Sequence, residues 1–230
     1  SSPLTLGNNM QMNAALTLNG GSDLTLNGTI SGSGRLIKNG AAGLTLNGVN
    51  NYGTGTLLNG GDLTLGNASA LGSGLLTING TSQLNTNGSM RLANDMRING
   101  ALDIAGSNIL SLDGRLNGEG TLTKRGAGSL ERSGGGSFRG TFDLLEGSLV
   151  VTGNNALGRD AKANIAAGAD LQVATSASLG SIFGTGRVSI GAGQTLTMTR
   201  IDGFLGDDFR GSLTGAGMFT MNSSGALTLS

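Results

Sequence analysis

The stretch from Leu16 to Gly28 reads LTLNGGSDLTLNG, and it shows the pattern that decides the fold. It holds two Leu-Thr-Leu triplets, and an Asn-Gly pair follows each of them. Each triplet is a minimal strand of period two, with both Leu on one face and the Thr on the other. Further copies of the triplet begin at Leu4, Leu44, Leu63 and Leu227.

One triplet cannot bury its own pair of Leu side chains. Stacked copies of the triplet bury them in a continuous column, which is the principle of a solenoid. The recurring unit therefore predicts an all-β fold, a right-handed parallel β-helix (β-solenoid), over residues 1–230 as a single segment. We expect Leu on the inside and Thr45 and Thr64 on the outside; the side chains expected to point inward are Leu44, Leu46, Leu63, Leu65, Leu122, Leu149 and Val151.

The corners between strands are predicted from glycine and asparagine. Nine Asn-Gly pairs occur, and the last is Asn117-Gly118. Gly adopts a positive φ without steric cost, and Asn tolerates the left-handed region. Stacked Asn side chains can hydrogen-bond along a solenoid as a ladder. With roughly 20 residues per turn and strands about 4.8 Å apart, the chain makes about eleven rungs and a rod on the order of 50 Å long.

Composition excludes several classes of protein. Gly supplies 44 of 230 residues, yet there is one Pro and no G-X-Y period, which excludes collagen. Charged residues make up 12% of the chain and balance to zero, which argues against a nucleic-acid partner or an anionic membrane surface. Aromatic residues make up 3% and Trp is absent, so stacking platforms for bases or sugars are scarce. Since no helical periodicity is visible, we expect almost no helix.

The chain has no Cys and no His. A disulfide framework, a thiolate zinc site and a Ser-His-Asp triad are therefore excluded. A Cys-free chain rich in Gly and Asn suits an extracellular protein that crosses a membrane unfolded. No apolar run reaches the roughly 18 residues of a membrane-spanning helix, and no signal peptide stands at the start. We interpret the sequence as a piece of something longer.

A longer repeat is superimposed on the triplets. When the chain is shifted by 86 residues, Gly32-Ser-Gly-Arg-Leu36 falls on Gly118-Glu-Gly-Thr-Leu122, and Tyr52 falls on Phe138. Looser copies of the Gly-x-Gly corner begin at Gly184 and Gly215. We expect repeat copies near 32–84, 118–173 and 184–230. Their unequal spacing predicts loops inserted between rungs.

The run from Gly32 to Leu65 resembles the passenger-associated transport repeat, which occurs in bacterial autotransporter passengers. The pattern is roughly G-x-G-x-L-x-K-x-G-x-G-x-L-x-L-x-G, followed by an aromatic residue with Gly and then G-x-L. Lys38 and Lys124 both occupy its lysine position. The second copy, Gly118 to Val151, departs from the pattern where Glu131-Arg132 replaces a Leu-Ser type of ending.

The resemblance implies a right-handed parallel β-helix at the bacterial cell surface, or secreted, by way of the outer membrane. It implies that a C-terminal outer-membrane β-barrel carries the passenger in the full-length protein. On this basis we expect a rigid stalk or adhesion scaffold whose partners are a host cell, the matrix or another copy of itself. No nucleic acid is expected to bind.

The densest polar cluster lies in the 200–210 loop, between apolar residues that include Phe204 and Phe209. Its members are Arg200, Asp202, Asp207, Asp208 and Arg210. Some β-helix polysaccharide lyases and hydrolases use grouped carboxylates with a basic residue. The alternative function is therefore a glycan-active or glycan-binding β-helix that uses this loop. A solvated inserted loop, anchored by its aromatic side chains, is the interpretation we favour.

Other polar motifs are weaker. Asp103, Asp113 and Glu119 fit surface positions. Gly20-Gly-Ser-Asp23 and Gly60-Gly-Asp62 are similar to the start of calcium-binding nonapeptides, but the tandem G-G-x-G-x-D spacing is missing. Leucine-rich repeats fail because no helical segment closes the rung. The Asn-x-Ser/Thr triplets arise from composition, and isolated Thr-x-Thr pairs do not form the two Thr columns of an ice-binding solenoid. We expect no enzymatic activity, no catalytic, metal or cofactor-binding residues, and no cofactor.

Overall fold

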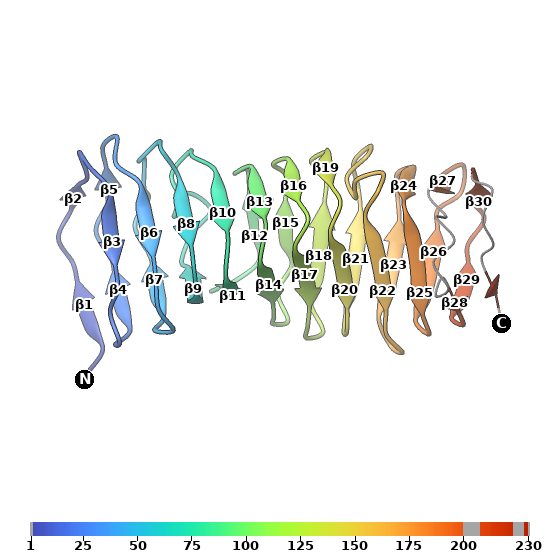
Figure 1. The fold of residues 1–230 in the computed structure, drawn as a ribbon, viewed down its shortest axis with the longest axis horizontal. Coiled ribbons are helices and arrows are strands. Elements are labelled where there is room, and N and C mark those ends of the chain that lie inside the picture. The colour runs from blue at the N-terminus through green and yellow to red at the C-terminus, as the bar shows by residue number, and fades with distance from the viewer. Residues whose placement is uncertain (1, 200–207, 223–227, 230) are drawn as a thin grey trace.

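The computed structural model describes residues 2–199, 208–222 and 228–229. Every regular element in these ranges is a β-strand, and none is a helix. The strands stack along one axis, with the N-terminal and C-terminal ends at opposite ends of the row (Figure 1). Each pair of neighbouring strands in a sheet is parallel. The predicted all-β parallel solenoid is confirmed.

The coil has three faces, which we number in chain order. The first face is a twelve-stranded sheet in which each strand pairs with its successor one turn later. Its strands are β1 (Leu4–Leu6), β4 (Leu24–Leu26), β7 (Leu44–Leu46), β9 (Gly61–Leu65), β11 (Thr81–Thr86), β14 (Ala101–Ile104), β17 (Thr121–Lys124), β20 (Thr141–Leu144), β22 (Lys162–Ile165), β25 (Ser181–Gly184), β28 (Asp208–Phe209) and β31 (Thr228–Leu229).

The second and third faces are each built from two sheets. The second face consists of β2 (Met10–Gln11), β5 (Ile30–Ser31), β12 (Met90–Leu92), β15 (Leu110–Leu112), β18 (Ser129–Arg132), β21 (Ser148–Val151), β23 (Asp170–Val173), β26 (Arg187–Ile190) and β29 (Ser212–Thr214). The third face consists of β3 (Leu16–Leu18), β6 (Leu36–Lys38), β8 (Thr56–Leu58), β10 (Leu76–Ile78), β13 (Met96–Ile98), β16 (Leu116–Gly118), β19 (Gly136–Phe138), β24 (Ala177–Leu179), β27 (Thr195–Met198) and β30 (Met218–Met221).

The rung length follows from the strand register. Leu4 pairs with Leu24, and Leu24 pairs with Leu44, so equivalent residues lie 20 positions apart. The same column continues through Leu63 to Leu84. Stacking therefore places Leu on Leu in successive rungs, as the triplets predict.

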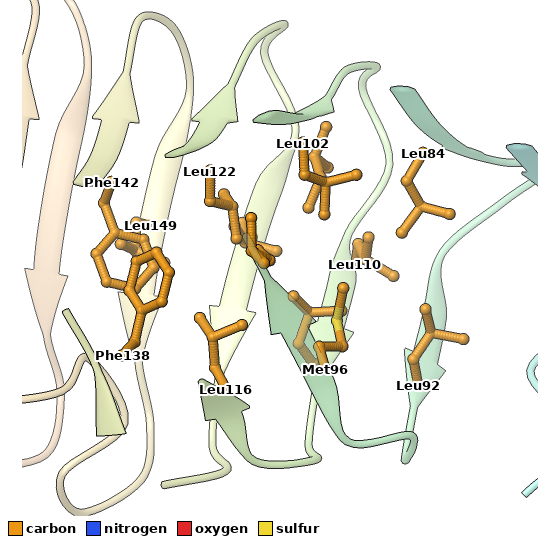
Figure 2. Packing of buried hydrophobic residues seen from close by; sticks show 14 of the residues in the cluster. Leu84, Leu92, Met96, Leu102, Leu110, Leu116, Leu122, Phe138, Phe142 and Leu149 are labelled. Carbon is orange, nitrogen blue, oxygen red and sulfur yellow. The ribbon is translucent and has the colours of Figure 1, made fainter. Parts of the chain in front are cut away.

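The core is a continuous column of apolar side chains between the three faces. Leu102, Leu122 and Phe142 form a row on the first face, and the third-face residues Met96, Leu116 and Phe138 lie opposite them (Figure 2). All seven side chains predicted to point inward are buried. Thr45 and Thr64 stay partly exposed on the outer surface. Phe138 and Phe142 meet edge to face, with ring centroids 5.0 Å apart.

The Gly-x-Gly corners keep one local conformation at all four copies. The first glycines have a φ of 104°, 106°, 106° and 99°, in the order Gly32, Gly118, Gly184, Gly215. A Cβ added at any of them would lie 2.1 to 2.3 Å from a carbonyl oxygen of the preceding rung. Glycine is required there by the positive φ and by the close approach of the two backbones.

Each copy of this corner begins a strand on the next face of the solenoid. Its apolar residue is Leu36 on the third face, Leu122 on the first, Val188 on the second and Phe219 on the third. The intervals between corners are 86, 66 and 31 residues. The register shows that these intervals are four, three and one whole turns, each followed by a step of one face.

The expectation that inserted loops cause the unequal spacing is therefore wrong for the first two intervals. They differ because they contain different numbers of whole turns. In the last interval the turn from Val188 to its partner Leu213 is lengthened to 25 residues. That turn contains residues 200–207, which lie outside the described residues.

Gly118→Ala tests the requirement for glycine at these corners. Besides the positive φ, the new Cβ would lie 2.1 Å from the Ile98 oxygen. We expect a loss of at least about 2 kcal/mol of unfolding free energy, because backbone strain and a backbone collision add together. Chemical denaturation monitored by circular dichroism measures the loss.

Gly106→Ala is the matched control for this prediction. Gly106 has a φ of 110°, but a Cβ there would meet nothing within 4 Å. The Gly106→Ala variant should therefore lose unfolding free energy through backbone strain alone, on the order of 1 kcal/mol. Equal losses in the two variants would show that the close approach at Gly118 has no energetic weight.

Candidate functional site

Only part of the 200–210 loop that the sequence singles out lies within the described residues. Arg200, Asp202, Phe204 and Asp207 lie outside the described residues. Phe209 is in β28 and is 3% exposed, so it packs in the core, as the anchoring interpretation of the loop requires. The neighbouring residues Asp208 and Arg210 remain on the surface.

Asp208 and Arg210 bind each other. The Arg210 Nε donates to the Asp208 Oδ2 at 2.6 Å, and Nη2 lies at the same distance. This hydrogen bond raises the pKa of Arg210. The described part of the predicted cluster is thus an exposed ion pair.

A depression of about 530 Å³ lies beside Arg210, between the first and second faces. Asp170 lines it and is nearly buried. The Asp170 Oδ2 accepts from the Arg187 Nη2 at 2.6 Å and from the Gln172 Nε2 at 2.8 Å. Arg187 and Arg210 are therefore both engaged by carboxylates. The described residues that line the depression offer neither a free cation nor a pair of facing acids.

The remaining polar motifs are also used structurally. Asp103 accepts from Arg125 at 2.7 Å, and Asp113 accepts from Arg91 at 3.0 Å. Asp23, in the calcium-like motif, accepts from the Gly43 backbone at 2.7 Å. Among residues 2–199, 208–222 and 228–229, no group of three or more acidic side chains is placed to hold a metal ion.

Two lysines of the repeat lie inside the solenoid. Lys38 is 3% exposed, and its Nζ donates to the carbonyl oxygens of Gly40 and Gly60 at 3.0 and 3.1 Å. Lys124 binds the carbonyls of Arg125 and Gly126 at 2.7 and 2.6 Å. Burial lowers the pKa of both ammonium groups. The lysine of the repeat thus serves the glycine corners, where backbone carbonyls would otherwise lack donors.

Arg132 is the most deeply buried charged side chain of the described chain. Its guanidinium donates to five backbone carbonyl oxygens at 2.6 to 3.4 Å, those of Leu112, Gly114, Gly134, Gly135 and Ala156. Burial lowers the pKa of Arg132 to about 10. Sequence reasoning missed this role, although the 86-residue shift places Arg132 on the inward residue Leu46.

Asparagine side chains form the predicted ladder along one edge. Asn39 donates to Asn19, Asn59 donates to Asn39, and Asn99 donates to Asn79, at 2.7 to 2.9 Å. A second, shorter series links Asn47 to Asn27 at 2.7 Å. These amides tie each rung to its neighbour outside the core.

Tyr52, the single tyrosine of the chain, provides a probe of burial. Its side chain is buried, and its hydroxyl is 2.7 Å from the Thr56 hydroxyl. Burial raises the pKa of Tyr52 to about 12 from the ordinary value of 10.0, and the Thr56 hydrogen bond acts in the opposite sense. We expect the ultraviolet signal of tyrosinate to appear near pH 12 in the folded chain and near pH 10 in denaturant.

The same difference affects stability at high pH. The unfolded phenol ionises near pH 10, so the Tyr52 contribution is complete below pH 10 and is lost toward pH 12, by about 1.4 kcal/mol per pH unit. Arg132 has the opposite effect on stability between pH 10 and pH 12. The folded guanidinium loses its proton from about pH 10, whereas the unfolded guanidinium keeps its proton there, so this contribution to stability rises with pH. The difference between wild type and Tyr52→Phe isolates the tyrosine contribution. A folded chain that titrates near pH 10 would contradict the burial.

Known proteins give one informative comparison. No family model matches the chain, and no solved structure matches it. The chain is 36% identical, over 129 residues, to the adhesin BmaC autotransporter of Brucella suis biovar 1 (strain 1330). The aligned segment is 54% of this chain and spans 4% of the length of that protein.

Sequence similarity and fold agree with each other. Both are consistent with an autotransporter passenger domain. The expected resemblance to an autotransporter passenger is thereby confirmed. The matched relative is an adhesin. No helix among the described residues of this chain is long and apolar enough to cross a bilayer.

Proposed function

We propose that this chain is a rigid segment of an autotransporter passenger, displayed at the bacterial surface or secreted, and that it serves as a stalk or adhesion scaffold. The observation that carries the proposal is the unbroken sheet of twelve parallel strands over one continuous core. The similarity to an autotransporter adhesin supports it. The buried cations and the asparagine ladder add contacts between rungs.

The mechanism of such a scaffold is structural. Each rung contacts only its neighbours, so stiffness along the axis is a sum of interfaces between rungs. The strand hydrogen bonds run parallel to this axis, and so does the Asn ladder. A rod of twelve strands about 4.8 Å apart is on the order of 50 Å long and holds its two ends at a fixed separation.

The proposed partners follow from the relative. A C-terminal outer-membrane β-barrel would carry the passenger across the outer membrane, and a host cell, the matrix or another copy would be the adhesion target. The balanced charge of the chain disfavours nucleic acid.

Single-molecule pulling on the full chain tests the stalk. We expect resistance followed by stepwise release of whole rungs, each adding about 70 Å of contour for 20 residues. Extension at low force without steps would exclude a load-bearing role. Beads coated with the folded chain then distinguish an adhesive scaffold, which retains them on host cells or matrix, from a passive spacer, which does not.

We propose that the segment performs no chemistry, and the glycan-active alternative gives the direct test. Turnover of acidic or neutral polysaccharides by the purified chain, abolished in Asp208→Asn or Asp207→Asn, would establish the alternative. The Asp208–Arg210 ion pair supports the scaffold, since the Asp208 carboxylate is engaged by a neighbouring side chain.

A further inference from the structure

The nine Asn-Gly pairs share a chemical vulnerability as well as a conformation. In an Asn-Gly sequence the glycine nitrogen can attack the Asn side-chain Cγ, because no glycine side chain obstructs the approach. A C–N bond forms, the bond from Cγ to Nδ2 breaks, and ammonia leaves. Water then opens the cyclic imide to aspartate or isoaspartate. Asparagine is accordingly one of the thermally labile residues of proteins.

The attack requires two freedoms that a structure can withhold. The Asn side chain must rotate toward the following nitrogen, so a hydrogen bond to its amide opposes the reaction. The glycine must also move with the closing ring, so tight backbone contact or an engaged N–H opposes it as well. These two conditions can be read for each of the nine pairs.

Eight of the nine asparagines are restrained through their side chains. Seven belong to the ladder and its shorter companion, namely Asn19, Asn27, Asn39, Asn47, Asn59, Asn79 and Asn99. Asn117 accepts from the Ser137 backbone and hydroxyl at 3.1 and 2.9 Å. Asn87 is the exception: its exposed side chain has no hydrogen bond within the described residues.

The space around the glycine of each pair distinguishes Asn87-Gly88 from most of the other pairs as well. A Cβ built on Gly28, Gly48, Gly80, Gly100 or Gly118 would lie within 2.3 Å of a backbone oxygen of another rung. Gly88 meets nothing within 4 Å, and no partner of its N–H occurs in the described structure. At Gly20 the nearest atom is 3.6 Å away. Asn87-Gly88 is thus the pair in which both conditions for ring closure are met.

We propose that Asn87 is a site of spontaneous deamidation and that the asparagine ladder protects the other pairs. The product places a new carboxylate at the corner between β11 and β12. In the isoaspartate form it also adds one methylene to the main chain there. The passenger therefore carries a position whose charge changes with its age after folding.

Mass spectrometry of the folded full chain, kept in mildly alkaline buffer, tests the proposal. Deamidation adds about one mass unit, and fragmentation assigns it to a residue. We expect Asn87 to convert first, and the ladder asparagines about fivefold slower or more, the factor that corresponds to one hydrogen bond of about 1 kcal/mol. In denaturant the difference between the nine pairs should disappear. A folded chain in which Asn39 or Asn59 converts as fast as Asn87 would overturn the proposal.

Two variants sharpen the test. Gly88→Ala adds a Cβ where there is open space, so the fold is kept while the attack on Asn87 is hindered, and conversion at Asn87 should nearly stop. Asn39→Ala removes the hydrogen bond of Asn19, whose following glycine is uncrowded, so Asn19 should become a second fast site. Circular dichroism verifies that each variant is folded. Unchanged rates at Asn87 and Asn19 in these variants would refute the cyclic-imide route and the protective role of the ladder.

Discussion

Leu65→Asp is expected to unfold the rungs around β9. The Leu65 side chain is fully buried, and its neighbours in register are Leu46 and Thr86. A carboxylate at this position would lack any compensating partner in the core, at a cost of several kcal/mol. Because rungs are coupled only to their neighbours, the loss spreads from β9 to the adjacent turns. Thermal melting followed by circular dichroism should show a large decrease in Tm.

Thr64→Asp is the matched control for this prediction. Thr64 is the preceding residue of the same strand, and its side chain points outward. The same carboxylate there remains hydrated, so the change should stay within about 0.5 kcal/mol. If Leu65→Asp left the melting curve unmoved, the inward register of the first face would be refuted.

Among variants that remove one charged side chain, Arg132→Ala is expected to lose the most unfolding free energy. It leaves five backbone carbonyls of the corner without their shared donor. Each buried acceptor left unpaired costs about 1–3 kcal/mol, less whatever water can enter the space. Removing the buried charge also removes its desolvation cost, which offsets part of this effect. We still expect the free energy of unfolding, measured in urea, to fall by at least about 3 kcal/mol.

Arg125→Ala separates this effect from a general loss of positive charge. Arg125 binds Asp103 on the surface, and its side chain is 53% exposed. Exposed ion pairs contribute about 0–1 kcal/mol, so this variant should resemble the wild type. Equal losses in the two variants would mean that the carbonyl contacts of Arg132 carry no special weight.

The sequence predicts the fold well because its strongest signal is also its main source of stability. Leu-Thr-Leu specifies the inward pair, and the 20-residue spacing of the triplets gives the rung. Asn-Gly places the corners and the ladder. The step of one face at each Gly-x-Gly corner was missed, although a shift of 86 residues at roughly 20 residues per turn is about 4.3 turns, which is four turns and one face. Arg132 was missed because charged residues are seldom fully buried. Its burial depends on five carbonyl partners, and three of them, on Leu112, Gly114 and Ala156, lie 18 to 24 residues away in the sequence.

The advance of the Gly-x-Gly corner from face to face has a consequence for how such a solenoid contacts a partner. The same local surface recurs along the axis, each time rotated around the circumference by one third of a turn. A flat partner approaching from one side can therefore touch equivalent corners only at every third copy. A partner that engages consecutive copies must follow a helical path around the rod. Adding or deleting whole 20-residue rungs changes the distance between such sites without changing their azimuth.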